Sequence, residues 1–491
     1  MKKQLLICLL FITAHVWSQT QLGSDIEGLT NDEESGTSVS LSGDGSIVAI
    51  GSPLNDNNGT DAGLARVFEF NSNTQMWEQL GNDIFGEAAN DKFGHSVSLS
   101  DDGSILAVGA PFNGANSEGH VRVYTFNTNT NTWDQLGVDI DGAASGDQSG
   151  YSVSLSSDGT ILAVGSPFYN IDEGRVFVYS FNSNTNSWEQ LGSTDVEPST
   201  AFGRFGYSIS LAANGFTLAV GSITTPQGGN VRIYTYDSNT EIWDQRGTRI
   251  DGESSSNYFG NSVSLSDDGN TIAAGGPFNS DSGPAAGHVR VFTYNTNISD
   301  WEQVGNDIDG QLSAADSGYS VSLSSDGTIV AVGARSYETS DASGQIRLLK
   351  YNITSEVWDQ LGTDITGEVS SFLGYAVSLS SDASVVAIGS PFLNIGSNPG
   401  HVEVYSFDQI LSIETSLIQQ TKLYPNPAKD QFAINLKENI DLEEILIYNQ
   451  LGQLVKKSTT KITDIHELSS GLYLITIQTD KGSTHQKLII D

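Results

Sequence analysis

A sevenfold internal repeat restricts the possible folds of this chain more than any other feature. Its marker is the string VSLS or a close variant, and successive copies begin 54 to 58 residues apart. A repeat of this kind usually buries its hydrophobic face only against its neighbours, so the copies are expected to fold as one array. The seven copies begin at Val39, Val97, Val153, Ile209, Val263, Val321 and Val377.

Each copy has the pattern of four short antiparallel strands. In the copy from Phe93 to Gly137, SVSLS alternates apolar and polar residues, DG marks a tight turn whose two residues favour positive φ, and SILAVGAP is a continuous apolar run. After a variable loop, HVRVYTF alternates again, NTNTNT turns, and WDQLG forms the last strand. Four such strands per repeat are typical of one blade of a β-propeller.

The ends of the chain favour a closed ring over an open solenoid, whose repeats usually run to only about 20 to 45 residues. The seventh repeat ends at Phe407 without a fourth strand. Residues 21–28, QLGSDIEG, resemble a fourth strand but lie before the first repeat, with no first three strands preceding them. We therefore predict an all-β fold, a seven-bladed β-propeller over residues 19–407 closed by an N-terminal strand. The fourth-strand tryptophans are Trp77, Trp133, Trp188, Trp243, Trp301 and Trp358.

Residues 1–18 have the features of a secretory signal peptide. Lys2 and Lys3 precede an apolar stretch from Leu5 to Ile12 that is too short to span a bilayer, and cleavage is expected after Ser18. A lipoprotein signal acylated at Cys8 is the alternative, but Ile7 stands where a small residue is required. The mature chain then contains no cysteine and no expected transmembrane segment.

Net charge excludes several classes of partner. The chain has 59 acidic and 22 basic residues, a formal charge of -37, and residues 19–421 alone hold 50 acidic and 12 basic residues. Because nucleic acids and anionic membranes are bound by basic groups, we expect neither as a partner. Cations and neutral polymers fit this surface better.

Residues 422–491 differ in composition, with eight Lys against nine Asp or Glu, and lack the repeat. Short strand patterns at FAINL, EILIYN, LYLITI and HQKLII predict a small antiparallel β-sandwich, joined to the propeller by a linker over residues 408–421.

The repeats resemble the FG-GAP repeats of the integrin α-chain propeller at FGHSVSLSDDGSILAVGAP and GHVRVY. The resemblance implies the propeller and a surface role such as adhesion. Calcium-binding blades of that family carry a long DxDxDG hairpin loop, whereas the hairpins here, such as SDDGS, are too short to enclose an ion with 6 to 8 oxygen ligands.

The C-terminal segment resembles the type A sorting domain of the type IX secretion system of Gram-negative bacteria. The resemblance implies an export signal read by that machinery, and a mature protein that is secreted or held at the outer-membrane surface; a small adhesion module is the alternative. The matching motifs are YPNP, IYNQLGQLV, GLYLITI and KLII, with the signal residues Tyr424, Pro425, Asn426, Pro427, Gly452, Gly471, Tyr473 and Lys487.

Most recurrent residues have a structural explanation in the sequence. We expect the tryptophans to pack between blades, and we expect His120, His288 and His401, which lie on separate blades, to be structural. The two DIDG stretches are more open, since they are expected in linkers where paired carboxylates bind a cation, calcium being the cofactor considered. The candidate ligands are Asp139, Asp141, Asp307 and Asp309.

Two functional hypotheses follow. The first is a non-catalytic, monomeric, secreted or surface propeller whose variable loops bind a glycan, a protein or a cation-bridged partner. The second is a secreted polysaccharide-degrading enzyme with a pair of carboxylates on one face. No nucleophile elbow, phosphate-binding GKS or GKT loop, or HExxH helix is found in the sequence, which favours the first.

Overall fold

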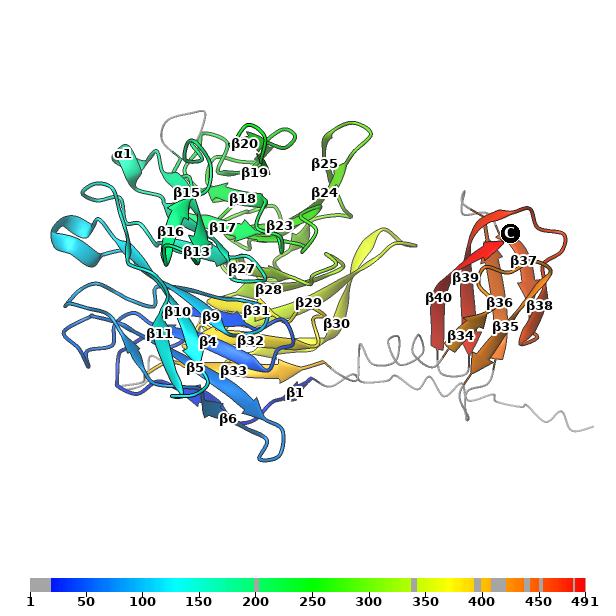
Figure 1. The fold of residues 1–491 in the computed structure, drawn as a ribbon, viewed down its shortest axis with the longest axis horizontal. Coiled ribbons are helices and arrows are strands. Elements are labelled where there is room, and N and C mark those ends of the chain that lie inside the picture. Colours follow the sequence, from blue (N-terminus) through cyan, green and yellow to red (C-terminus); the bar gives the residue numbers. More distant parts are fainter. Residues whose placement is uncertain are drawn as a thin grey trace, which may run out of the picture. The chain divides into compact units, whose positions relative to one another are not determined.

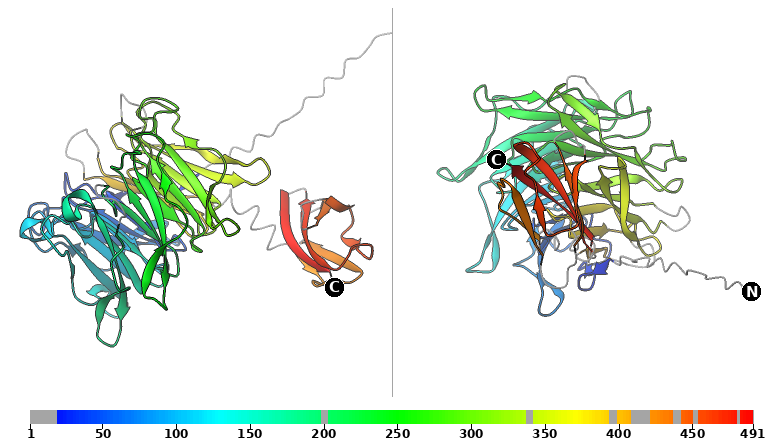
Figure 2. Two further views of the ribbon diagram at one scale, coloured as in Figure 1. Left: turned by 90° about the horizontal axis from the view of Figure 1, so that it is seen from above. Right: turned by 90° about the vertical axis from the view of Figure 1, so that its right-hand side faces the viewer.

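The computed structural model describes residues 19–197, 203–336, 342–392, 399–407, 421–436, 442–449, 454–479 and 482–490. The expected signal peptide, its cleavage site at Ser18, most of the expected linker (residues 408–420) and Gly452 lie outside these residues. The chain divides into two compact units, one of Gln19–Ser406 and one containing Phe407–Asp491. Both are built of antiparallel sheets (Figures 1 and 2).

The first unit contains seven sheets of the same design, which we call the seven-sheet domain. In each sheet the first strand lies at one end of the pairing order and pairs with the second. The first strands are β3 (Ser38–Leu41), β8 (Ser96–Leu99), β13 (Ser152–Leu155), β17 (Ser208–Leu211), β22 (Ser262–Leu265), β27 (Ser317–Leu323) and β31 (Ala376–Leu379). The second strands are β4 (Ile47–Ser52), β9 (Ile105–Ala110), β14 (Ile161–Ser166), β18 (Thr217–Ser222), β23 (Thr271–Gly276), β28 (Ile329–Ala334) and β32 (Val385–Ser390).

The third strand of each sheet pairs with the second on one side and with one or two outer strands on the other. The third strands are β5 (Leu64–Asn71), β10 (His120–Asn127), β15 (Arg175–Asn182), β19 (Asn230–Asp237), β24 (His288–Asn295), β29 (Gln345–Asn352) and β33 (His401–Ser406). The outer strands are β6 (Met76–Gln79), β7 (Ile84–Phe85), β11 (Thr132–Gln135), β12 (Ile140–Asp141), β16 (Ser187–Gln190), β20 (Ile242–Gln245), β21 (Ile250–Asp251), β25 (Asp300–Gln303), β26 (Ile308–Asp309), β30 (Val357–Thr366), β1 (Thr20–Gln21) and β2 (Ile26–Glu27). Two single turns, η1 (Asn113–Ser117) and α1 (Tyr169–Asp172), lie in loops.

The VSLS motif connects neighbouring sheets. Its apolar residues are buried, except for the half-buried Val377. The serine between them reaches the next sheet: Leu99 N–H donates to Ser40 Oγ at 3.0 Å, and Leu155 N–H donates to Ser98 Oγ at 3.0 Å. The same bond recurs around the domain, and Leu41 N–H donates to Ser378 Oγ of the last sheet at 3.0 Å. Each of the seven sheets therefore contacts the next, and the last contacts the first, since β31 and β32 lie against β3; β32 is seen beside β4 in Figure 1.

The N-terminal segment supplies the outer strands of the seventh sheet, as predicted. Thr20 pairs with Ser406 in β33, Ile26 pairs with Val402, and Leu22 N–H donates to Val404 O at 2.7 Å. The first and last parts of the seven-sheet domain are thus held together by one sheet.

The outer-strand tryptophans pack between sheets. Trp133 lies against Phe126 of its own sheet, with ring centroids 5.3 Å apart, while its indole N–H donates to Leu80 O of the preceding sheet at 2.9 Å. Trp188 bonds Leu136 O in the same way at 3.0 Å. A buried indole needs such an acceptor, which explains the fixed position of the tryptophan in the repeat.

The second-strand glycine permits close packing of one sheet on the next. A Cβ on Gly109 would overlap the backbone carbonyl oxygen of Gly150, and a backbone atom cannot swing aside. We expect Gly109→Ala to destabilise the domain by about 3 kcal/mol, the upper end of the cost of overpacking. Denaturant unfolding of the purified chain measures this, and Gly203→Ala, whose nearest neighbour would be Thr225 at 3.5 Å, is the control with little effect.

The second unit contains two antiparallel sheets that share one core. One sheet has the order β34-β35-β38 and the other β37-β36-β39-β40. Phe432 and Ile434 of the first sheet pack with Ile445, Ile475 and Leu488 of the second, as expected for a small sandwich. The strands are β34 (Thr421–Tyr424), β35 (Gln431–Leu436), β36 (Leu442–Tyr448), β37 (Leu454–Ser458), β38 (Ile462–Asp464), β39 (Gly471–Thr479) and β40 (Gly482–Ile490).

Candidate functional site

The loops that differ in sequence from repeat to repeat lie along one edge of the seven-sheet domain. Since Ser96 at the start of β8 pairs with Gly109 near the end of β9, and Val121 of β10 pairs with both Gly109 and Ile140, these strand ends share one edge. The variable loops and the linkers to the next sheet leave from it. We call it the loop face, and the opposite edge, which carries the DG turns, the turn face.

A ring of mostly aromatic side chains surrounds the centre of the loop face. Each member is the residue before the recurrent pattern of a first strand. Several neighbours are in contact: ring centroids are 4.6 Å apart for His95 and Tyr151, 5.0 Å for Tyr151 and Tyr207, and 5.0 Å for Tyr319 and Tyr375. All are half-buried. This axial ring consists of Thr37, His95, Tyr151, Tyr207, Asn261, Tyr319 and Tyr375.

The axial ring is uncharged at neutral pH. Burial lowers the pKa of His95 to about 4, although its Nδ1 lies 3.2 Å from the carbonyl oxygen of Tyr151 and makes a hydrogen bond to it. Burial also raises the pKa of Tyr151, Tyr207 and Tyr319, and the phenols perturb one another. The ring therefore offers aromatic faces and neutral hydrogen-bonding groups.

A second layer of aromatic and cationic groups borders the axial ring. Phe168 lies 5.8 Å from Tyr151, and Phe392 lies 5.6 Å from Tyr375, centroid to centroid. The guanidinium of Arg335 lies 3.8 Å over Tyr319, held by a 3.1 Å hydrogen bond from its Nε to Asp316 Oδ2. Aromatic faces with hydrogen-bond donors beside them suit the apolar faces and hydroxyls of sugars.

Two clusters on the loop face combine a buried histidine with two carboxylates. The first contains Glu87, His120 and Asp139, and the second contains Glu253, His288 and Asp307; in each, the candidate ligand atoms lie within 4.8 Å of one another. In both clusters the histidine begins a third strand. The aspartate precedes the short outer strand of the same sheet, and the glutamate comes from the linker of the preceding sheet.

The two clusters differ in how closely an arginine pairs with their carboxylates. Arg122 bonds Asp139 through Nε and Nη2, both at 3.1 Å, and also contacts Glu87, so both carboxylates of the first cluster are paired with it. In the second cluster the nearest contact of Arg290 to a carboxylate is Nη1 to Glu253 Oε1 at 3.7 Å. Burial raises the pKa of Glu253, and repulsion by Asp307 adds to this.

Among the described residues, one aspartate of each predicted DIDG pair joins a cluster with a histidine. Asp139 and Asp307 join the clusters, whereas Asp141 and Asp309 are exposed. The expectation that these stretches are linkers is wrong: Ile140–Asp141 and Ile308–Asp309 are the short outer strands β12 and β26, which pair with β10 and β24. Residues two apart along a strand share a face. Burial raises the pKa of Asp309, and repulsion by Asp307 adds to this, so the two carboxylates of that pair lie near each other.

The sequence did not reveal the glutamates of these clusters. Glu87 and Glu253 precede their histidines by 33 and 35 residues, across two strands of the repeat. The available signal was their shared place in GEAAND and GESSSN, upstream of the two repeats that have GHVR. His120 and His288 do lie on separate sheets, as expected.

The DG turns differ from the expected form. Gly103 has φ 68°, but Asp102 is not left-handed, and Gly103 N–H donates to Ser100 O at 2.9 Å. The turn is therefore a four-residue one, in which Asp102 Oδ1 accepts bonds from the hydroxyls of Ser100 and Ser104, both at 2.7 Å. Asp102 is therefore a turn former.

Acid should weaken these turns. Burial alone would raise the pKa of Asp102, but hydrogen bonds from Ser100 and Ser104 outweigh it and lower the pKa below the ordinary 3.8. A lowered pKa in the folded state means stability that is present above about pH 4 and is lost as the pH falls through the lowered value. We expect Asp102→Asn to reduce the acid sensitivity of unfolding below about pH 4, as followed by denaturant titrations. Asn214 holds this position naturally in the fourth sheet and bonds Phe216 N–H at 2.8 Å, so the substitution keeps the acceptor.

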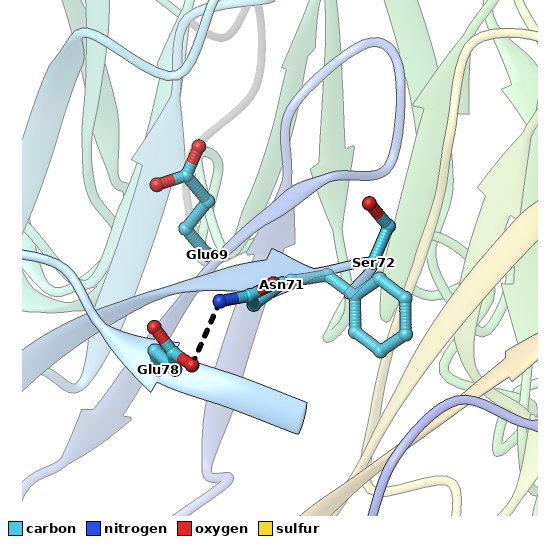
Figure 3. A pocket seen from close by; sticks show the side chains of 5 residues that line it. Glu69, Asn71, Ser72 and Glu78 are labelled. Atoms are coloured by element: carbon cyan, nitrogen blue, oxygen red, sulfur yellow. Dashed lines mark hydrogen bonds between the residues drawn. The ribbon is translucent and has the colours of Figure 1, made fainter. Parts of the chain in front are cut away.

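A hollow beside β5 and β6 is not a distinct site. It encloses about 250 Å³ between Glu69, Asn71 and Glu78 (Figure 3), less than the roughly 300 Å³ at which ligand pockets begin. Its Asn71 Nδ2 to Glu78 Oε1 bond, 2.9 Å, recurs between Asn182 and Glu189 at 2.8 Å. The hollow therefore belongs to the repeated hairpin.

The sorting residues that the structure describes all lie in the second unit. The exposed Asn426 of the YPNP motif donates from Nδ2 to Lys487 O at 2.7 Å and accepts from Ile489 N–H at 2.9 Å. Tyr473, in β39 after Gly471, is buried in the shared core, and its hydroxyl donates to Ser469 O at 2.8 Å. Tyr424, Pro425, Pro427 and Lys487 are exposed. The first and last motifs of the segment are thus joined at one place.

Comparison with known families identifies both units as parts of an exported repeat protein. Residues 422–491 match the secretion system C-terminal sorting domain, and residues 86–126 match the FG-GAP repeat. The second unit is therefore a type IX export signal, which interacts with that secretion machinery and directs the protein to the cell surface or the medium. Among the described residues, no helix has the length and hydrophobicity needed to cross a membrane.

Individual relatives match only small parts of the chain. Ulvan lyase NLR42 of Nonlabens ulvanivorans is 36% identical over 87 residues, 16% of each protein, and an endo-acting ulvan lyase of Formosa agariphila is 30% identical over 118 residues, 20% of this chain and 22% of that one. The chain thus spans less than a quarter of the length of either. A solved periplasmic gluconolactonase of Pseudomonas aeruginosa has a TM-score of 0.47 and 17% identity, over 68% of this chain and 85% of that one.

Proposed function

We propose that this exported protein is a seven-bladed β-propeller that binds a glycan at the axial ring without cleaving it. The observation that carries the proposal is that the axial-ring position holds different residues in different repeats. Its neighbours Gly and Ser recur in nearly every copy, while the position itself holds Thr37, His95, Asn261 and four tyrosines. Folding alone does not require unlike residues at equivalent positions, whereas binding of an asymmetric ligand does.

The chemistry of the axial ring favours a polyhydroxylated ligand. Four phenols with raised pKa values and one imidazole with a lowered pKa are neutral, and neighbouring rings lie at about 5 Å, in the range of aromatic contacts. Such a surface provides stacking and hydrogen bonds. It needs no charge on the ligand, which agrees with a domain whose net charge repels polyanions.

A polysaccharide-degrading enzyme is the second candidate, favoured by the partial matches to ulvan lyases. Those alignments, of 87 and 118 residues, are far shorter than the seven-sheet domain. The carboxylates of Glu87 and Asp139 approach within 4.8 Å and share Arg122, whereas a retaining glycosidase pair stands about 5 to 5.5 Å apart and leaves one group free. This arrangement supports an ion-paired cluster over a catalytic pair.

A glycan and polysaccharide array with the purified mature protein separates the two candidates. We expect retention of the protein on one glycan class, while mass spectrometry of the incubated polysaccharide finds no shortened or unsaturated products. Depolymerisation of the retained glycan would support the enzyme. Absence of retention on every glycan would refute the proposed ligand class.

A further inference from the structure

We propose that Glu253, His288 and Asp307 bind a divalent transition-metal ion, with Zn²⁺ the best fit. The three side chains converge on the loop face from a linker, from β24 and from the segment before β26. This site is separate from the axial ring, and its occupancy does not depend on the proposed glycan.

Distances within the cluster suit a tetrahedral ion. His288 Nδ1 lies 3.3 Å from Asp307 Oδ2 and 3.8 Å from Glu253 Oε2. Ligands that surround Zn²⁺ tetrahedrally at about 2.1 Å lie about 3.4 Å from one another. Glu253 is exposed, so its carboxylate can close the remaining gap by a small rotation.

The imidazole of His288 points to a missing ligand. Its side chain is 0% exposed, and in the described structure neither nitrogen has a partner in hydrogen-bond geometry, although Nδ1 lies 3.3 Å from Asp307 Oδ2. A buried polar atom without a partner in hydrogen-bond geometry destabilises the fold. A metal ion on Nδ1 would satisfy the atom that faces the two carboxylates.

Charge at this place also favours a cation. Asn279 Nδ2 bonds both Glu253 Oε2 at 3.3 Å and Asp281 Oδ2 at 3.1 Å, which brings a third carboxylate to the cluster. Arg290 is the cation beside these carboxylates: its Nη1 lies 3.7 Å from Glu253 Oε1, while its Nη2 donates to Asp251 O at 2.5 Å and its guanidinium lies 4.2 Å over Phe259.

The free lone pairs are correctly placed. Gln303 Nε2 donates to Asp307 Oδ1 at 2.7 Å, which fixes that carboxylate and leaves Oδ2 directed at His288. A mixed imidazole and carboxylate set selects zinc and its neighbours over Ca²⁺ and Mg²⁺, which prefer oxygen ligands alone. Three protein ligands leave a fourth position open.

The equivalent cluster in the second sheet is an internal control. There Arg122 bonds both oxygens of Asp139, and His120 Nδ1 lies 3.8 Å from Asp139 Oδ2. Because the guanidinium already neutralises this carboxylate and would repel an ion, we infer that only the cluster at His288 binds metal.

Calorimetric titration of the chelator-treated mature chain with ZnCl₂ tests the proposal. We expect one saturable site whose affinity falls about tenfold or more in Asp307→Asn, a loss at least as large as that from removing an outer partner of a metal ligand. Asp139→Asn should leave the affinity within about twofold, and Ca²⁺ and Mg²⁺ in equal amount should not compete.

A second readout guards against loss by misfolding. Zinc should raise the unfolding temperature of the native chain and of Asp139→Asn, but not of Asp307→Asn, whose unfolding without zinc should match the native chain. Equal zinc affinity in the native chain and Asp307→Asn, an equal loss in both variants, or no saturable site would overturn the proposal.

Discussion

Removal of residues 19–30 should destroy the cooperative stability of the seven-sheet domain. The segment provides β1 and β2 of the seventh sheet, and its loss would expose Val402 and Val404 in β33. Several hydrogen bonds would be lost with it, including Trp77 Nε1 to Leu22 O at 2.8 Å and Arg66 Nη2 to Glu27 O at 2.7 Å. Buried apolar surface and hydrogen bonds together suggest a loss on the order of 5 kcal/mol or more.

Tryptophan fluorescence during denaturant unfolding measures this loss in the full mature chain. All tryptophans of the mature chain lie in the seven-sheet domain, so the signal reports on it alone. A matched pair of substitutions localises the effect. Ile26→Asp buries a charge at a position that is 5% exposed and should unfold the domain at much lower denaturant, whereas Leu29→Asp, at 48% exposure, should change little. An unaltered midpoint for the deletion would mean that the seven-sheet domain does not need its N-terminal strand.

Removal of residues 422–491 should abolish export beyond the periplasm. The segment matches the secretion system C-terminal sorting domain and forms a unit of its own, with the exposed YPNP motif tied to the last strand through Asn426. We expect the truncated protein to lose its signal peptide and to accumulate in the periplasm, with essentially none at the surface or in the medium. Immunoblots of the separated fractions measure this.

Substitutions in the second unit separate a folded signal from a linear one. Leu488→Asp places a charge in the shared core, where Leu488 is 0% exposed, and should block export as the truncation does. Ile462→Asp, at 60% exposure, should be exported normally. Export of Leu488→Asp at the native level would show that the machinery reads the sequence of the segment and not its fold.

Most of the fold could be predicted from the repeat, because strands and tight turns are recognised from short stretches of sequence. A two-residue period and a DG turn predict a strand pair wherever they occur, and seven copies remove the ambiguity of any one. The serine of VSLS was visible as a recurrent residue. Its bond from Ser40 to Leu99, 59 residues away, was not predictable, because it depends on the offset between neighbouring sheets.

The candidate sites were less predictable, since both depend on contacts across sheets. Asp307 was selected from its DIDG motif, but its partners His288 and Glu253 lie 19 and 54 residues away in the chain. The axial ring left a clearer signal: one variable, mostly aromatic position between recurrent Gly and Ser. The sequence-based prediction concentrated on residues that recur in every repeat, and it therefore passed over this position, which differs from repeat to repeat.

Glycan binding by axial-ring variants tests the central claim most directly. The measurement is the affinity of the mature protein for the glycan class that it retains, compared with Tyr151→Ala, Tyr319→Ala and Phe216→Ala. Phe216 follows a turn at the turn face and is 42% exposed. We predict that each tyrosine variant binds about tenfold more weakly or worse, a loss of about 1.4 kcal/mol, while Phe216→Ala binds as the native protein does. Native affinity in both tyrosine variants would contradict the account.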